Sequence, residues 1–170
     1  MVRLLNIAEM PRVDGMSTPF EVYTVIKEPA LLAGMRYPIG ISWDKLKEAG
    51  FTSIVCLSEN YPSYDPSPLQ ELHTVCLEDL CCGGPLDSKL QEKLVRSATK
   101  TVFEGLGMGE DIIIHCMGGT GRTGTVIGCV LRELGVPANT VIGYLNDLNV
   151  ARGVGGWPEN KWQAEMVWKY

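Results

Sequence analysis

One stretch of the chain combines a cysteine, a glycine-rich run and an arginine at a spacing that suits phosphate chemistry. Residues 115–124 read His-Cys-Met-Gly-Gly-Thr-Gly-Arg-Thr-Gly, so five residues separate Cys116 from Arg122. The apolar run at 111–115 before it predicts a buried parallel strand, and the residues after it follow a helical pattern. Ligands of α/β sheets bind where strands end, and free N–H groups at the start of a helix favour an anion. The stretch therefore predicts an oxyanion site.

Each residue type in this stretch has a chemical use. Glycines allow the backbone to curl until successive N–H groups converge on one centre. These donors and the positive end of the helix are expected to favour the thiolate of Cys116. The planar guanidinium of Arg122 can bind two phosphoryl oxygens at once. Such a thiolate and clamp predict phosphoryl transfer through a cysteinyl-phosphate. The residues expected to bind the phosphate are Met117, Gly118, Gly119, Thr120, Gly121 and Arg122.

Other interpretations of the same residues are weaker. Residues 119–124 also fit the Gly-x-Gly-x-x-Gly loop of dinucleotide-binding folds, but residues 142–147, where that fold needs an acidic strand end, lie in a helical pattern. A Walker loop needs Gly-Lys-Ser/Thr, which is absent. Cys116 could also be a buried structural cysteine beside a tight turn. The glycines and Arg122 argue against that simpler interpretation.

The pattern His-Cys-x5-Arg-Thr-Gly resembles the signature of the protein tyrosine phosphatase superfamily, in its small (atypical) dual-specificity branch. The resemblance implies that the Thr123 hydroxyl helps the thiolate leave in the second step. It implies that His115 orients the loop and supports the thiolate. It also implies an aspartate general acid on a loop upstream of the nucleophile, after the preceding strand, and Asp79 occupies that place. Asp87, which suits a helix N-cap, and Glu78 are the alternatives.

Beyond the signature, the resemblance extends over about residues 20–170. Residues 32–38 are similar to a segment near the substrate entrance of small dual-specificity phosphatases. Glu159 and Gln163 match a Glu-x-x-x-Gln pattern in the final helix of several members, where Gln163 could position the hydrolytic water or be a solvated amide. Trp157-Pro158-Glu159 resembles the acid-bearing loop of larger tyrosine phosphatases, but it lies downstream of the cysteine, so we assign it no such role. Cys56 lies near the place of a redox partner found in some members, one residue out of register.

The elements around the site alternate between strands and helices. This predicts an α/β fold with a central, mostly parallel twisted sheet of about four or five strands, flanked by helices. We expect residues 1–19 to be an irregular N-terminal segment packing on the domain, and residues 20–170 to form a single phosphatase catalytic domain. Strands are expected at 20–26, 52–57, 72–77 and 111–115, and helices at 43–49, 87–103, 123–134, 138–150 and 159–169.

Composition limits the partners of the protein. The 170 residues carry a net charge of −5, which disfavours nucleic acid and anionic membranes as partners. Six scattered cysteines without a C-x-x-C pair and only two histidines argue against a zinc site or a disulfide framework. No apolar run is long enough to span a membrane, and the first residues do not form a signal peptide. We expect a cytoplasmic monomer that needs no cofactor and no metal.

The substrate is less well indicated than the reaction. The loop interior at 117–121 carries no charge, whereas relatives that act on phosphoinositides or inositol polyphosphates usually have lysines there. The glycine pair at 118–119 resembles that of the phosphatase that acts on a cyclin-dependent kinase. We therefore expect a phosphorylated protein substrate, with phosphotyrosine at least and phosphoserine or phosphothreonine as further candidates. The alternatives are a phosphoinositide or inositol phosphate phosphatase and a catalytically idle phospho-binding module.

Overall fold

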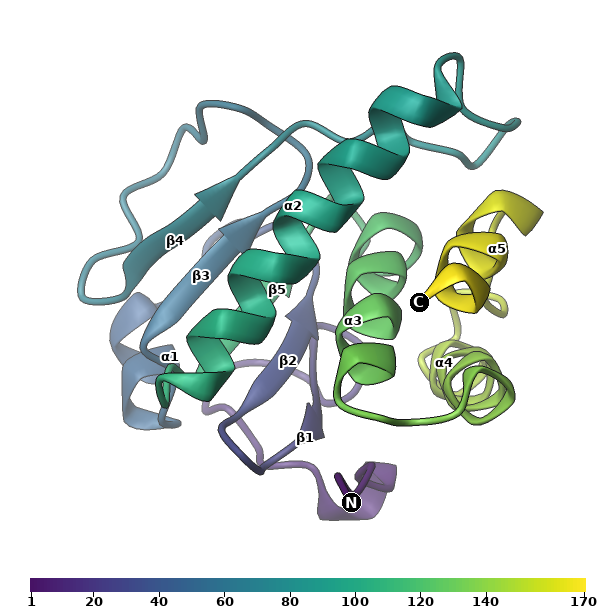
Figure 1. The fold of residues 1–170 in the computed structure, drawn as a ribbon. Helices are drawn as coiled ribbons and strands as arrows, with labels where there is room; N and C mark the ends of the chain where they lie inside the picture. Colours follow the sequence, from purple (N-terminus) through teal and green to yellow (C-terminus); the bar gives the residue numbers. More distant parts are fainter.

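Five strands form one sheet in the computed structural model, which describes residues 1–170 (Figure 1). They lie in the order β1-β2-β5-β3-β4, and all neighbours are parallel except β1 and β2. The predicted α/β fold with a mostly parallel sheet is therefore confirmed. The strands are β1 (Val22–Ile26), β2 (Leu32–Met35), β3 (Ser53–Cys56), β4 (Gln70–Thr74) and β5 (Ile112–His115). The sequence pattern does not predict β2, because its four residues are all buried and show no alternation.

The helices agree with the sequence expectation except at their ends. α2 continues beyond the predicted end at Phe103, so the glycine at position 105 lies inside the helix. It packs against Ile112 and Leu72, where a side chain would be crowded. α5 begins after Asn160, whose side chain accepts a hydrogen bond from the N–H of Trp162. The helices are α1 (Trp43–Glu48), α2 (Ser88–Gly107), α3 (Gly121–Glu133), α4 (Ala138–Ala151) and α5 (Lys161–Lys169), with a 3-10 turn at Ile7–Glu9.

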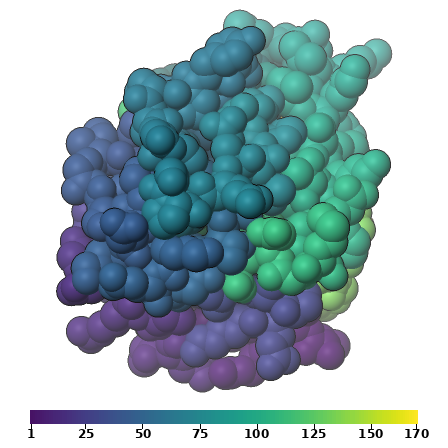
Figure 2. Space-filling model, turned by 90° about the vertical axis from the view of Figure 1, so that its left-hand side faces the viewer, coloured from purple at the N-terminus to yellow at the C-terminus, as the bar shows by residue number.

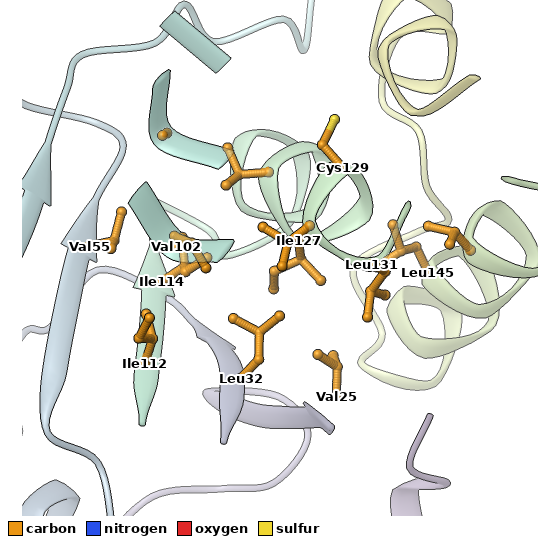
Figure 3. Packing of buried hydrophobic residues seen from close by; sticks show 14 of the residues in the cluster. Val25, Leu32, Val55, Val102, Ile112, Ile114, Ile127, Cys129, Leu131 and Leu145 are labelled. Carbon is orange, nitrogen blue, oxygen red and sulfur yellow. The ribbon is translucent and has the colours of Figure 1, made fainter. Parts of the chain in front are cut away.

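Apolar side chains pack on both faces of the sheet. On β5, Ile112 and Ile114 belong to the larger cluster under α2 and α3, whereas Ile113 belongs to a smaller one that includes Leu46 of α1. Figure 3 shows Ile127 of α3 facing this larger layer, with strand residues below it. A central strand buried on both sides is fixed in register, so its carboxyl end is a firm base for the residues that follow.

The N-terminal segment is tied to the rest of the chain. The N–H of Leu5 donates to Val25 O (2.9 Å), and the hydroxyl of Tyr144 donates to Leu5 O (2.9 Å). Leu5 and Met10 are buried in the larger cluster. In Figure 2 the N-terminal residues, in purple, lie along the lower edge of the face shown. None of the helices combines the length and the apolar character that crossing a bilayer would require.

Candidate active site

The loop that joins the end of β5 to the start of α3 turns its carbonyl groups into the protein. The carbonyls of Gly118 and Gly119 accept hydrogen bonds from the guanidinium of Arg152, at 3.1 and 2.9 Å. The carbonyl of Met117 accepts from the N–H of Tyr37 at 2.9 Å. No backbone N–H of residues 117–121 donates a hydrogen bond within the protein. Because C=O and N–H point in opposite directions across a peptide unit, the free N–H groups of this loop are left for an oxyanion.

The structure requires one of the three glycines in this loop more than the others. Gly119 has a φ of +70°, and a Cβ there would lie 2.5 Å from the carbonyl oxygen of Met35. A Cβ on Gly121 would meet the carboxylate of Glu159, which is the end of a side chain and can move away. Gly118 has open space and no positive φ, so neither effect excludes a Cβ there. The predicted glycine cradle therefore depends most strongly on Gly119.

Cys116 is held by hydrogen bonds on both sides. The hydroxyl of Thr123 donates to Cys116 Sγ over 3.1 Å, which stabilises a thiolate. His115 Nδ1 lies 3.0 Å from Cys116 O, and Nε2 faces the hydroxyl of Tyr64. Burial lowers the pKa of His115, so the neutral ring donates through Nδ1 and accepts from Tyr64 through Nε2. Thr123 thus contacts the sulfur and His115 the carbonyl of Cys116, while the roles that the resemblance implies for them stay predictions.

Arg122 and Asp79 meet at the mouth of the loop. Nη2 of Arg122 lies 3.6 Å from Oδ2 of Asp79, and Nη1 donates to Leu77 O at 3.4 Å. The other carboxylate oxygen of Asp79 accepts from the N–H of Cys81 at 3.2 Å, which fixes the short turn after Leu77. Cys116, Arg122 and Asp79 line one cavity of about 50 Å³. The connection from β4 to α2 therefore brings a carboxyl group to the nucleophile.

The two alternative acids have other partners. Asp87 is the N-cap of α2 and accepts from the N–H of Leu90 at 3.0 Å. Glu78 accepts from the N–H of Leu86 at 3.1 Å. Neither residue lines the cavity over Cys116. Of the three candidates, only Asp79 faces the nucleophile.

Gln163 is placed below the rim rather than in the cavity. Its side chain is buried, and Oε1 accepts from the N–H groups of Glu159 (2.9 Å) and Asn160 (3.3 Å), which caps α5. A role in positioning water stays a prediction. The residue that does line the cavity is Glu159, to which the sequence analysis gave no role. Its position follows from Trp157, whose Nε1 donates to Gly121 O at 3.4 Å and folds the segment back over the start of α3.

Sequence reasoning also missed Arg152, which supports the loop from below. The residue is 4% exposed, and burial lowers the pKa of its guanidinium. It also lies 4.5 Å from the centre of the Tyr23 ring. A lone arginine after a helix carries no local signal, because its partners lie far away in the chain. Its hydrogen-bond acceptors are Pro19 O, Phe20 O, Gly118 O, Gly119 O, Thr120 Oγ1 and Asn149 Oδ1.

Cys56 lies on the opposite side of the sheet from Cys116. It pairs in register with His115, so the two share a face, and Cys116 follows on the other face. Its thiol contacts Ser58 Oγ at 3.8 Å and Glu59 O at 3.7 Å. The one-residue offset expected from the sequence is therefore present, and it separates the two sulfurs.

Comparisons with known proteins find similarity in sequence and in fold. A family described as "PTP-SAK: Swiss Army Knife protein, DSP-PTPase phosphatase domain" matches residues 24–152. The chain is 23% identical over 123 residues to phosphatidylglycerophosphate phosphatase PTPMT1 of Arabidopsis thaliana, covering 69% of this chain but only 34% of that protein. The solved structure of kinase associated phosphatase (KAP) aligns with a TM-score of 0.60 and 17% identity, over 81% of this chain and 84% of that chain. The catalytic domain of the PP-IP phosphatase SIW14 from S. cerevisiae aligns with a TM-score of 0.60 and 18% identity, over 82% and 80%. The two structures show a shared fold.

Proposed function

Because the chain belongs to the DSP-PTPase phosphatase family, and is thus a cysteine-based phosphatase of the tyrosine phosphatase superfamily, we propose that it removes phosphate from phosphotyrosine, phosphoserine and phosphothreonine in proteins. The observation that carries this proposal is the loop of residues 117–121, whose N–H groups are free beside Cys116 while its carbonyls are bound. A tetrahedral phosphoryl group satisfies such donors.

In the first step, Cys116 Sγ attacks phosphorus and the bond from phosphorus to the leaving oxygen breaks. Asp79 gives its proton to that oxygen, which leaves as an alcohol or phenol. Arg122 and the loop N–H groups hold the three non-bridging oxygens, on which the charge develops. The product of this step is a cysteinyl-phosphate.

In the second step, water attacks the cysteinyl-phosphate and Cys116 leaves as a thiolate. The ionised Asp79 takes a proton from the water, reversing its first role. The Thr123 hydroxyl, 3.1 Å from Cys116 Sγ, stabilises the departing sulfur. Phosphate is released and the thiolate is ready again.

A protein substrate is supported by the shape and charge of the cavity. Its volume is about 50 Å³, which suits a single phosphoryl group rather than a large phosphorylated headgroup. The only cation in its lining is Arg122, whereas a substrate with several phosphates would need more. KAP, which shares the fold, is a kinase-associated phosphatase.

The test is a substrate panel with the purified protein. We expect hydrolysis of p-nitrophenyl phosphate and phosphopeptides that vanadate inhibits and EDTA does not, with no turnover by Cys116→Ser. The panel includes phosphatidylglycerophosphate and an inositol pyrophosphate, since PTPMT1 and SIW14 are named for such compounds. A higher kcat/KM for either of these than for every phosphopeptide would refute a protein substrate. Tight phosphopeptide binding without turnover would instead indicate an idle binding module.

A further inference from the structure

Glu159 places a second carboxylate at the rim of the cavity. It lines the cavity together with Cys116 and Arg122, and its carboxylate lies directly over Gly121 of the loop. The side chain is exposed, so a bound substrate can meet it. Neither the proton transfers nor the binding of the phosphoryl group, as proposed above, uses this residue.

The structure holds the backbone of Glu159 in place. Its N–H donates to Oε1 of the buried Gln163 at 2.9 Å, within the cap that starts α5. Two residues earlier, Trp157 is buried and bonded to Gly121 O. The segment that carries this carboxylate is therefore anchored and is not a free loop.

The charges at the rim do not balance. Asp79 lies 3.6 Å from Arg122, and Glu159 lines the same cavity, in which Arg122 is the only cation. The pKa of Glu159 is raised by partial burial and by the charge of Asp79, while Arg122 opposes this rise. Once a phosphoryl group engages Arg122, the carboxylate of Glu159 faces the groups next to the phosphate, while Asp79 carries the proton that it gives to the leaving oxygen. There Glu159 attracts cations and repels anions.

We propose that Glu159 determines specificity by selecting phosphoresidues flanked by lysine or arginine over phosphate esters that carry further negative charge nearby. This inference rests on the protein phosphatase activity proposed above. Glu159 is the part of the rim that can be tested alone, because Asp79 also has a role in the proposed chemistry.

The experiment compares kcat/KM for two phosphotyrosine peptides that differ only in having lysine or glutamate at the two flanking positions. It is run with the wild type, Glu159→Gln and Glu104→Gln. Glu104 is exposed on α2 outside the cavity, so its substitution removes the same charge elsewhere and serves as the control. We expect the wild type to prefer the lysine peptide about tenfold, with the preference decreasing as salt rises from about 50 mM to about 500 mM. Glu159→Gln is expected to reduce the preference about threefold to fivefold, mainly through KM.

The possible outcomes separate this inference from the function on which it rests. An unchanged preference in Glu159→Gln, or an equal change in Glu104→Gln, overturns the inference while peptide turnover leaves the proposed function intact. An equal loss of kcat for both peptides also overturns it, because Glu159 would then act on the chemical step. If the wild type hydrolyses p-nitrophenyl phosphate but neither peptide, the protein substrate itself is refuted and the inference with it.

Discussion

Replacement of Arg152 by methionine tests whether the catalytic loop is shaped from below. Methionine fills a similar volume but donates no hydrogen bond. The carbonyl of Gly118 then loses its charged donor, and the carbonyl of Gly119 keeps only the hydroxyl of Tyr23, at 2.6 Å. Residues 19 and 20 and the side chains of Thr120 and Asn149 also lose this donor. We therefore expect both a less stable protein and a poorer phosphate site.

The expected magnitude follows from these contacts. A buried acceptor left without its donor costs about 1–3 kcal/mol, and such losses are not additive. Burial lowers the pKa of Arg152, which shows that holding its charge inside is itself costly, and methionine removes that cost. We expect a net loss of about 3–5 kcal/mol in the free energy of unfolding. For a chain of this length this corresponds to a Tm lower by about 6–20 °C.

The decisive assay is vanadate inhibition measured at a temperature where the variant is folded. We expect the affinity of Arg152→Met for vanadate to fall at least about tenfold, because the loop N–H groups are no longer directed at one centre. Arg132→Met is the control, since Arg132 donates to Val136 O (2.9 Å) and Val167 O (3.3 Å) and does not touch the loop. It is expected to lose some stability but to bind vanadate normally. Wild-type vanadate affinity in folded Arg152→Met would refute the reasoning.

Three further predictions concern the loop and the proton donor. Asp79→Ala should lower kcat about 100-fold, whereas Asp87→Ala should keep kcat and lose about 1 kcal/mol of stability with its helix cap, and the reverse pattern would move the acid to Asp87. Gly119→Ala should abolish vanadate binding, since its Cβ would meet a carbonyl at a φ of +70°, while Gly118→Ala should bind normally; equal behaviour in a binding titration would contradict this. Thr123→Val should slow the second step about tenfold, so that the cysteinyl-phosphate accumulates and rapid-mixing assays show a burst of p-nitrophenol that the wild type lacks. A variant that turns over more slowly without any burst would count against this role.

Much of the fold was predictable because its signals are local. The apolar run of β5 and the breaks at Gly135 and Pro137 between α3 and α4 depend on neighbouring residues only. β2 was not predictable, since a four-residue strand buried on both faces shows neither periodicity nor a turn signal. The end of α2 was missed for a related reason. The sequence alone does not show whether the glycine at 105 breaks the helix or allows contact with Ile112.

The residues of the site also differ in whether a local sequence signal reveals them. Cys116, Arg122 and Thr123 lie within one short stretch, so their spacing reveals the chemistry. Arg152 and Glu159 act on that stretch from more than 30 positions downstream, through contacts that only the packed structure creates.

We assign the reaction and the proposed choice of substrate to different residues. Any sequence that curls residues 117–121 over a strand end and supplies Arg122 can hold a phosphoryl group, so the loop fixes the chemistry but not the partner. Two side chains reach the rim from other elements, Asp79 from the connection before α2 and Glu159 from the segment before α5. Asp79 is assigned to the proton transfers, which leaves Glu159 for the choice of partner. The side chain of Glu159 can change without disturbing the loop, because the carbonyls of Gly118 and Gly119 are held by Arg152 and that of Met117 by the N–H of Tyr37. Substrate choice in this protein should therefore respond to substitutions at the rim that leave the cysteine chemistry working.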